Sequence, residues 1–398
     1  MRIGLDARTL FAPNRRGIGK SLLRLYQELA AARPDWQVIA YHRTPPESSS
    51  KSSAGLISAW PADLPDNFTP RYIEMPGDRF DAWTQLRLPT AAKMDRVDLL
   101  HCPANVCPRW MPVPTLVTIH DLIPLDMPQG RPSQELKRFE QSIEAACTKA
   151  AGVVCPSQYT RDRLVSDHGL RPERGSVVPW GLTLGEHTID IARVDEIVRR
   201  YGIDRSYLLH FGAAEERKNT RGVIEAWAMV RKRYRKPWRL LIVGLDKPTR
   251  DEMTRLAAAL GVTRDLRLAG FVPENDLPQI LGSASMLIYP SLSEGFGLPI
   301  IEAFATATAV ITSDTTSLPE VTGGDLSDGG AALLVPPGRA TALANAITSL
   351  MKDPMRRAEL TTRGTKRLQN YDWRRSTEHF AQICKATAKL RSGRTAAA

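Results

Sequence analysis

Residues 286–302, MLIYPSLSEGFGLPIIE, place a short apolar run before a glycine-containing loop and a second apolar segment. Gly295 and Gly297 allow the backbone to approach a ligand closely, and Pro299 suits the first turn of a helix. The stretch therefore predicts a strand at Met286–Tyr289, a tight loop, and a helix at Pro299–Ala307. Strand, loop and helix in this order form the repeating unit of parallel α/β architecture.

The same alternation of short apolar runs and helical patterns extends over the whole chain. We expect an α/β fold with two Rossmann-like parallel-sheet domains, one at residues 1–180 and one at 181–372, joined at the Pro- and Gly-containing segment Val178–Leu182. We also expect a C-terminal helix at 373–390 that packs on the first domain, and a disordered tail at 391–398. The other strands are expected at Arg2–Leu5, Val38–Tyr41, Val97–His101, Thr115–His120, Gly152–Cys155, Ser176–Val178, Tyr207–Gly212, Arg239–Val243, Leu266–Ala269, Ala309–Thr312 and Ala332–Val335. The other helices are expected at Lys20–Arg33, Ser133–Ala150, Ser157–His168, Asn219–Arg233, Thr249–Leu260 and Glu274–Ser283, with Ser133 and Ser157 as N-caps.

Composition sets the outer limits on function. The 398 residues are 42% hydrophobic and 24% charged, with a formal net charge of +11, which admits nucleic acid, an anionic membrane surface or a phosphorylated substrate as a partner. The N-terminus lacks the apolar core of a secretory signal, and no apolar stretch is long enough to span a bilayer. Five cysteines without a C-x-x-C pair argue against a disulfide framework or a zinc site and favour buried thiols in a cytoplasmic protein.

The loop at 294–298 has the chemistry of a nucleotide-sugar site. Its N–H groups lie at a predicted helix N-terminus, which attracts phosphate. Glu294 and Glu302 flank the loop eight positions apart, with Glu302 expected in the first turn of the helix. Carboxylates accept hydrogen bonds from hydroxyls, so the combination suggests a ligand with both phosphate and sugar groups. The structural alternative is a glycine-rich turn with two solvated glutamates.

This run resembles the Glu-x7-Glu signature of retaining family-4 glycosyltransferases, and the resemblance extends over nearly the whole chain. It implies the GT-B fold, in which two Rossmann-like domains face a central cleft. It also implies that Glu294 contacts the transferred sugar, that Glu302 holds the ribose hydroxyls, and that the backbone of Gly295, Phe296, Gly297 and Leu298 contacts sugar and phosphate.

A second motif, HFGAAEERKN at 210–219, follows a predicted strand. Its two cations, Arg217 and Lys218, are therefore expected at the carboxyl edge of the second sheet, where ligands bind in open α/β sheets. The run resembles the family segment Gly-x-x-Glu-Pro-Arg-Lys-Asn, and Lys218 matches the lysine that contacts the donor diphosphate. Many members carry an arginine where this chain has Ala213, and we expect Arg217 to compensate. Solvated surface charges are the alternative.

Two motifs of the first half complete the expected site. His120 and Asp121 end a predicted strand; the family has a comparable histidine near the transferred sugar, so His120 is expected to donate to a sugar hydroxyl and Asp121 to face the acceptor. A lone histidine at such a place is otherwise structural. Gly17 and Gly19 lie in the run NRRGIGK at 14–20, which resembles the family's glycine-rich N-terminal loop near the donor phosphates. Leu22 stands where a dinucleotide fingerprint needs its third glycine, which counts against an NAD enzyme.

Two further features concern the nucleotide base and the membrane. Val272 follows another predicted strand and is expected to line the base pocket. Residues 352–398 carry a net charge of +8, and a second basic cluster lies at Arg231–Arg239. Attraction to anionic lipid is the functional interpretation of this charge, and a solvated basic face is the default one. No nucleic-acid-binding module is recognisable, so nucleic acid is not an expected partner.

Four short motifs, DAR at 6–8, GIG at 17–19, HDLIP at 120–124 and SLPE at 317–320, together resemble bacterial mannosyltransferases of polysaccharide and O-antigen assembly. This resemblance implies a retaining transfer of mannose from GDP-mannose, without metal or cofactor. The implied acceptor is a saccharide linked to polyprenyl diphosphate, at the inner face of the cell membrane. Alternatives are a UDP-sugar-dependent transferase, a nucleotide-sugar 2-epimerase and a non-catalytic binding protein.

Overall fold

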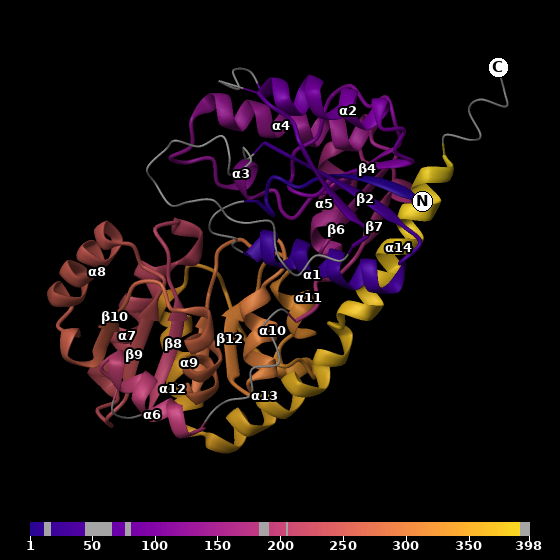
Figure 1. Ribbon diagram of the computed structural model, residues 1–398. Helices are drawn as coiled ribbons and strands as arrows, with labels where there is room; N and C mark the ends of the chain where they lie inside the picture. The colour runs from indigo at the N-terminus through magenta and orange to yellow at the C-terminus, as the bar shows by residue number, and fades with distance from the viewer. Residues whose placement is uncertain (12–16, 44–65, 76–80, 183–190, 204–205, 391–398) are drawn as a thin grey trace. The chain divides into compact units, whose positions relative to one another are not determined.

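The computed structural model describes residues 1–11, 17–43, 66–75, 81–182, 191–203 and 206–390. The chain divides into two compact units, the first formed by Met1–Thr183 together with Asp372–Ala398 and the second by Leu184–Tyr371 (Figure 1). The predicted boundary at 180/181 lies three residues before this division. The predicted disordered tail, 391–398, lies outside the described residues.

The first unit is built on a parallel seven-stranded sheet with the order β3-β2-β1-β4-β5-β6-β7. The interior strand β1 is buried from Ile3 to Asp6, and Ile3 faces Val38 on one side and Leu99 on the other. Near-continuous apolar runs suit strands that helices cover on both faces. The strands are β1 (Arg2–Asp6), β2 (Gln37–His42), β3 (Phe68–Tyr72), β4 (Leu99–Cys102), β5 (Thr115–Thr118), β6 (Gly152–Cys155) and β7 (Gly175–Val177).

Strand β3 was not predicted. It contains Pro70 and Arg71 in place of an apolar run, and it lies at the edge of the sheet. A proline lacks the N–H that an interior strand needs, so an edge is the place where a sheet accepts it. The other six strands of this unit were predicted within a few residues.

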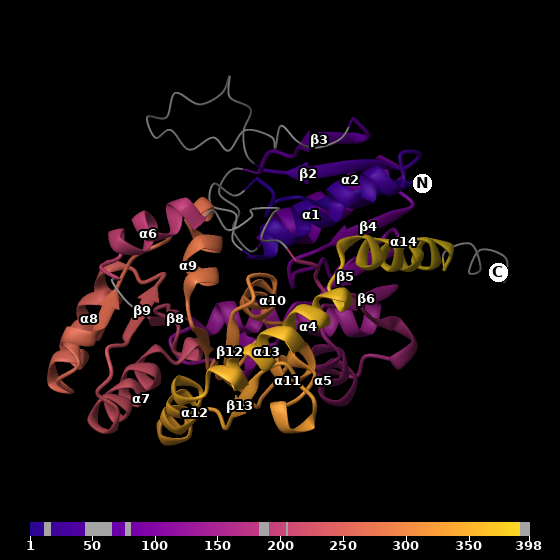
Figure 2. The same ribbon diagram turned by 90° about the horizontal axis from the view of Figure 1, so that it is seen from below.

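The last helix of the chain, α14 (Trp373–Lys389), belongs to the first unit, where it packs on α1 (Gly17–Ala32) and on β4 and β5 (Figure 2). The buried Phe380 ring lies 5.1 Å from the His101 ring and 6.2 Å from that of Tyr26. Trp373 donates to the Leu182 carbonyl at 2.8 Å. The other helical segments are η3 (Trp83–Arg87), α2 (Leu88–Met94), α3 (Ile123–Asp126), α4 (Ser133–Lys149), α5 (Gln158–His168) and η4 (Pro172–Arg174).

Of the two predicted N-caps, Ser157 is confirmed and Ser133 is wrong. The Ser157 side chain accepts a hydrogen bond from the Thr160 amide at the start of α5. Ser133 is instead the first helical residue of α4, after Pro132, whose extended backbone supplies the turn into the helix without a side-chain cap.

The second unit has a parallel six-stranded sheet with the order β10-β9-β8-β11-β12-β13. All six strands were predicted: β8 (Tyr207–Phe211), β9 (Arg239–Val243), β10 (Leu266–Leu268), β11 (Met286–Tyr289), β12 (Ala309–Ser313) and β13 (Leu333–Val335). Its helical segments are α6 (Ile191–Arg200), η5 (Glu216–Lys218), α7 (Thr220–Arg233), α8 (Lys247–Ala259), η6 (Thr263–Asp265), η7 (Glu274–Asp276), α9 (Leu277–Ser283), α10 (Leu298–Ala305), α11 (Leu318–Thr322), η8 (Leu326–Asp328), α12 (Ala340–Lys352), α13 (Pro354–Arg367) and η9 (Leu368–Asn370).

Each sheet has one point at which its strand order reverses. The reversal lies between β1 and β4 in the first sheet and between β8 and β11 in the second. Loops that leave these two strands turn to opposite faces of the sheet and leave a crevice at its carboxyl edge, where ligands bind in open α/β folds. The chain therefore carries two candidate ligand positions, one for each sheet.

All five cysteines are buried free thiols, as the sequence predicted. Burial raises the pKa of the Cys147 thiol to about 11 and that of Cys107 to about 12. Among the described helices, we find none with the length and apolar character needed to cross a bilayer.

Candidate active site

The strongest polar cluster of the second unit lies at its β8/β11 reversal. The chain leaves β8 through η5, which carries Arg217 and Lys218, and leaves β11 through the loop that carries Glu294. The Leu292 amide donates to the Arg217 carbonyl at 2.7 Å and ties the two loops together. Asn219, whose left-handed backbone (φ 56°) ends η5, donates from Nδ2 to the Pro290 carbonyl at 3.3 Å.

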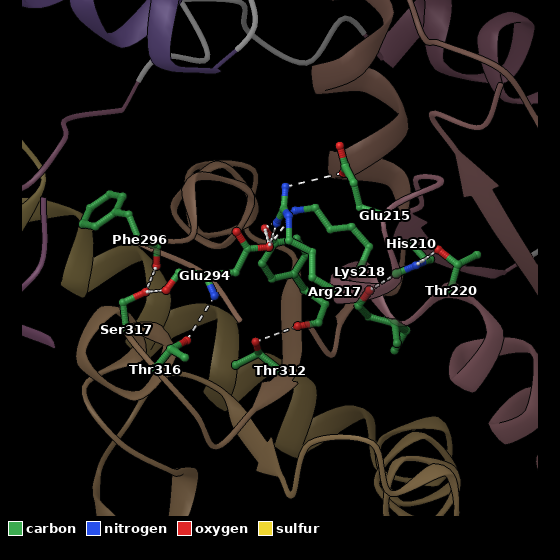
Figure 3. Close-up of polar contacts among 12 residues, drawn as sticks. His210, Glu215, Arg217, Lys218, Thr220, Glu294, Phe296, Thr312, Thr316 and Ser317 are labelled. Carbon is green, nitrogen blue, oxygen red and sulfur yellow. Dashed lines mark hydrogen bonds and ion pairs between the residues drawn. The ribbon is translucent and has the colours of Figure 1, made fainter. Parts of the chain in front are cut away.

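One oxygen of the buried Glu294 carboxylate gathers three donors (Figure 3). Oε1 accepts from Arg217 Nη1 at 2.8 Å, from Lys218 Nζ at 2.7 Å and from the Tyr289 hydroxyl at 2.7 Å. Lys218 Nζ also lies 2.7 Å from the Tyr289 hydroxyl and 4.6 Å from the centre of its ring. Glu215 approaches the other side of the Arg217 guanidinium, at 3.6 Å.

The two cations keep Glu294 ionised. Burial alone would raise the pKa of its carboxyl group, but Lys218 and Arg217, together with the hydrogen bonds, outweigh burial and lower it to about 2. Burial also lowers the pKa of Lys218, with Glu294 opposing that shift and Arg217 adding to it. The cluster places two cations beside the buried Glu294 carboxylate, and a second carboxylate, Glu215, faces Arg217 from the other side.

Hydrogen bonds from the segment that precedes α11 hold the loop at 294–297 in place. Ser317 Oγ is within hydrogen-bond distance of the Glu294 and Phe296 carbonyls, at 3.0 and 2.9 Å, and the Glu294 amide donates to Thr316 Oγ1 at 3.2 Å (Figure 3). Gly297 then adopts φ 118° and ψ 47°, a backbone conformation that favours glycine, and α10 begins at Leu298.

The remaining predicted donor residues of this unit lie around the same edge. Glu302 is the fifth residue of α10, so it stands in the second turn and not in the first, because the helix already begins at Leu298. The Phe296 side chain is buried and meets the Tyr371 ring edge-on at 5.7 Å. Val272 follows β10, at the edge of the sheet.

In the first unit, His120 is a neutral, buried side chain. Burial lowers the pKa of its imidazole to about 4. Its Nε2 lies 2.6 Å from the Pro103 carbonyl, which can only accept, so Nε2 carries the proton and Nδ1 remains as an acceptor. The contact of His120 with a sugar hydroxyl stays a prediction; with Nε2 bonded to Pro103, Nδ1 is the nitrogen left to make it, as an acceptor. The backbone of His120 is fixed by Asn105 Oδ1, which accepts from its amide at 2.6 Å.

The other predicted residues of the first unit lie at helix starts. Asp121 Oδ1 accepts from the Ile123 amide at 3.1 Å, which shapes the turn into α3. Gly17 and Gly19 form the first turn of α1; Gly17 is exposed and Gly19 is buried. Asn14–Arg16 of the same motif lie outside the described residues.

Three residues of the cluster were missed by the sequence analysis. Tyr289 was treated as part of an apolar strand, although a tyrosine that ends a strand beside a glycine loop is a signal of a buried hydrogen bond. Thr316 and Ser317 carry no signal of their own contacts, because the loop they support lies more than 20 residues earlier in the chain. Among the described residues, no group of three or more His, Cys, Asp and Glu side chains is placed to hold a metal ion; metal independence stays a prediction.

Two family models match the chain and together extend over most of it. The model described as Glycosyltransferase Family 4 matches residues 15–186, and the model described as Glycosyl transferases group 1 matches residues 194–367. The chain is 27% identical over 265 residues to O-antigen chain mannosyltransferase B of Escherichia coli, which is 66% of this chain and 68% of that relative. It is 28% identical over 222 residues to the serotype-specific mannosyltransferase WbdA of Escherichia coli, 54% of this chain and 27% of that relative, so the match spans about a quarter of WbdA.

Solved structures share the fold at low sequence identity. Sucrose-phosphate synthase from Thermosynechococcus elongatus superposes with a TM-score of 0.73 at 19% identity and covers 97% of this chain and 98% of its own. WaaG, a glycosyltransferase involved in lipopolysaccharide biosynthesis, superposes with a TM-score of 0.70 at 17% identity, covering 96% and 99%. Anabaena HepE, in complex with UDP and glucose, superposes with a TM-score of 0.73 at 16% identity. The match covers 97% of this chain and 100% of the HepE chain.

Proposed function

Because the chain belongs to the family-4 glycosyltransferases of GT-B fold, we propose that it transfers mannose, with retention, from GDP-mannose to a saccharide acceptor in polysaccharide assembly. The single observation that carries this proposal is the Glu294 cluster at the β8/β11 reversal. It combines an ionised carboxylate for sugar hydroxyls with Arg217 and Lys218 for a diphosphate.

The cations act on the leaving group. As the bond between sugar and diphosphate breaks, negative charge grows on the phosphate oxygen, and Arg217 and Lys218 stabilise it. Both are already oriented by Glu294, so little reorganisation is needed when the donor binds. Glu294 holds the sugar through its hydroxyls, and Glu302 takes the ribose. The acceptor attacks on the face that the diphosphate leaves, and a donor phosphate oxygen takes its proton.

The choice of mannose and GDP rests on the similarity to the two Escherichia coli mannosyltransferases. A UDP-sugar donor is the second candidate, because the structurally similar HepE is in complex with UDP and glucose. We propose a polyprenyl-diphosphate-linked acceptor and action at the inner face of the cell membrane on the basis of the basic C-terminal segment, and we propose that no metal takes part.

Calorimetric titration with GDP and UDP, followed by donor hydrolysis with GDP- and UDP-sugars, tests this function. We expect micromolar binding of GDP, slow release of mannose from GDP-mannose and no epimerised nucleotide sugar. Epimerisation without an acceptor would identify a 2-epimerase, and an absence of binding and turnover with every donor would rule the proposal out.

Glu294→Gln separates an enzyme from a binding protein. The substitution keeps the shape of the side chain and removes the charge that orients both cations, so we expect transfer to fall by about 100-fold or more. Glu252→Gln is the matched control, since Glu252 is exposed and pairs with Arg221 on the surface. Equal activity of the two variants would contradict a catalytic role for Glu294.

A further inference from the structure

The first sheet also has a cavity at its own point of reversal. About 340 Å³ of space opens beside segments that follow the carboxyl ends of the two flanking strands, Arg8 after β1 and Val106 to Arg109 after β4. Helix α4 and the segment around Asp81 close the other sides. This is the position in the first unit that corresponds to the Glu294 cluster in the second, and none of the predicted site residues lines it.

One wall of the cavity is rigid and electrically balanced. Arg8 donates from Nε at 2.9 Å and from Nη2 at 2.6 Å to the two carboxylate oxygens of the buried Asp6. Its guanidinium carbon lies 4.4 Å from the centre of the Trp83 ring, and Nη1 lies 4.0 Å from Asp81 Oδ1. These contacts fix the orientation of Arg8 and offset its charge.

Arg109 and Arg138 bring positive charge to other parts of the lining. The Gln85 side-chain oxygen accepts from the Arg109 amide at 3.0 Å and from Arg109 Nε at 3.4 Å, which orients that guanidinium with its two terminal nitrogens still available. Arg138 projects from α4, and within the described part of the chain neither arginine has a carboxylate in ion-pair distance. Glu135 of α4, which also lines the cavity, pairs with Arg131 at 3.0 Å.

We propose that this cavity binds a phosphate group of the acceptor, held by Arg109 and Arg138. A guanidinium presents a planar fork of donors that matches phosphate oxygens in pairs, and two of them at the mouth of one cavity favour a doubly charged group. Phe139, half-buried in the same wall, offers an apolar surface to the sugar or chain next to that phosphate. The inference rests on the proposed glycosyltransferase function; a sugar phosphate and a lipid-linked diphosphate share this chemistry.

The test compares acceptors with and without phosphate. The double variant Arg109→Gln/Arg138→Gln is assayed at saturating GDP-mannose with mannose on farnesyl diphosphate, with mannose 1-phosphate and with methyl mannoside. We expect the acceptor KM to rise tenfold or more for whichever phosphate-bearing acceptor the wild type uses, and to change less than twofold for methyl mannoside. If the wild type uses mannose on farnesyl diphosphate, the phosphate belongs to a lipid-linked acceptor; if it uses mannose 1-phosphate, the phosphate belongs to a sugar phosphate. Lys137→Gln, an exposed neighbour on α4 that does not line the cavity, is the control and should change neither value.

A binding measurement separates failure of this inference from failure of the proposed function. With saturating GDP or UDP present to occupy the donor position, mannose 1-phosphate and farnesyl-diphosphate mannose are titrated into wild type and double variant. The double variant should bind the preferred ligand at least tenfold more weakly, with an unchanged melting temperature because both arginines are exposed. Equal binding by the two proteins, or no binding of either ligand to wild type, overturns the inference whatever the result for donor hydrolysis.

Discussion

At the scale of single residues, the hydroxyl of Tyr289 positions the Glu294 carboxylate. It contacts both Glu294 Oε1 and Lys218 Nζ, and the ring is almost completely buried. We predict that Tyr289→Phe lowers kcat about tenfold and leaves the donor KM within about twofold, because the two cations still hold Glu294 but less rigidly. A tenfold loss corresponds to about 1.4 kcal/mol of transition-state stabilisation.

Tyr207→Phe is the matched control. Tyr207 is another buried tyrosine of the same unit, and its hydroxyl bonds to the Ile280 carbonyl and to Ser283, away from Glu294. Both variants should lose about 1 kcal/mol of unfolding free energy in urea, the usual contribution of a buried hydrogen bond. The positioning role of Tyr289 is refuted by equal kcat values for the two variants.

The sequence predicts Lys218 and Glu294 because each stands in a motif of its own. It does not predict that they share one oxygen, since this contact joins residues 76 positions apart and depends on β8 and β11 being neighbours. The tautomer of His120 is likewise invisible in the sequence, because it is set by a carbonyl 17 residues earlier in the chain.

At the scale of elements, the start of α10 depends on a backbone conformation that only glycine adopts easily. A Cβ on Gly297 would lie 3.2 Å from Leu318 Cδ2 and 3.4 Å from Ile300 Cδ1, at φ 118°. We predict that Gly297→Ala costs about 1–3 kcal/mol of unfolding free energy and weakens GDP binding about tenfold or more, because the loop amides shift with the helix.

Gly261→Ala gives the reference for this prediction. Gly261 also has a positive φ, 71°, but an added Cβ meets nothing within 4 Å. The Gly261→Ala variant should lose about 1 kcal/mol of unfolding free energy in a urea titration. Its affinity for GDP, measured by calorimetry, should be unchanged. If both variants lost affinity equally, general destabilisation and not the loop would be the cause.

Strands with strong apolar runs were predicted well. The twelve predicted strands are all present, whereas β3 was missed because an edge strand with Pro70 lacks the apolar pattern. Helix α12 was also missed, although Leu343, Ile347, Leu350 and Met351 carry the helical spacing and are buried. The carboxyl-edge position of Arg217, Lys218 and Glu294 followed from the strand pattern, but the strand order did not.

At the scale of the whole molecule, three buried histidines predict a loss of stability in mild acid. Burial lowers the pKa of His101 to about 3 and the pKa values of His120 and His210 to about 4. His101 and His120 belong to the first unit and His210 to the second. Below about pH 6.5 the unfolded chain binds protons that the folded chain does not, so stability falls as pH falls.

Each of these histidines contributes up to about 1.4 kcal/mol per pH unit between its unfolded and folded pKa values. Urea unfolding at pH 7.5, 6.5, 5.5 and 5.0 measures this loss of unfolding free energy. Glu294, whose pKa is about 2 in the folded chain, adds a second loss of stability only below about pH 4.5. A free energy of unfolding that stays level from pH 7.5 to 5.0 would show that the histidines are not held neutral.

The return of α14 to the first unit has a consequence for synthesis on the ribosome. The whole of Leu184–Tyr371 emerges before Phe380, the residue that covers Tyr26 and His101. The second unit can therefore finish folding while part of the core of the first unit is still exposed to water. This reverses the usual order, in which the domain translated first folds first. If translation stops after Tyr371, a protease should digest the first unit. The second unit should remain as a resistant fragment that binds GDP.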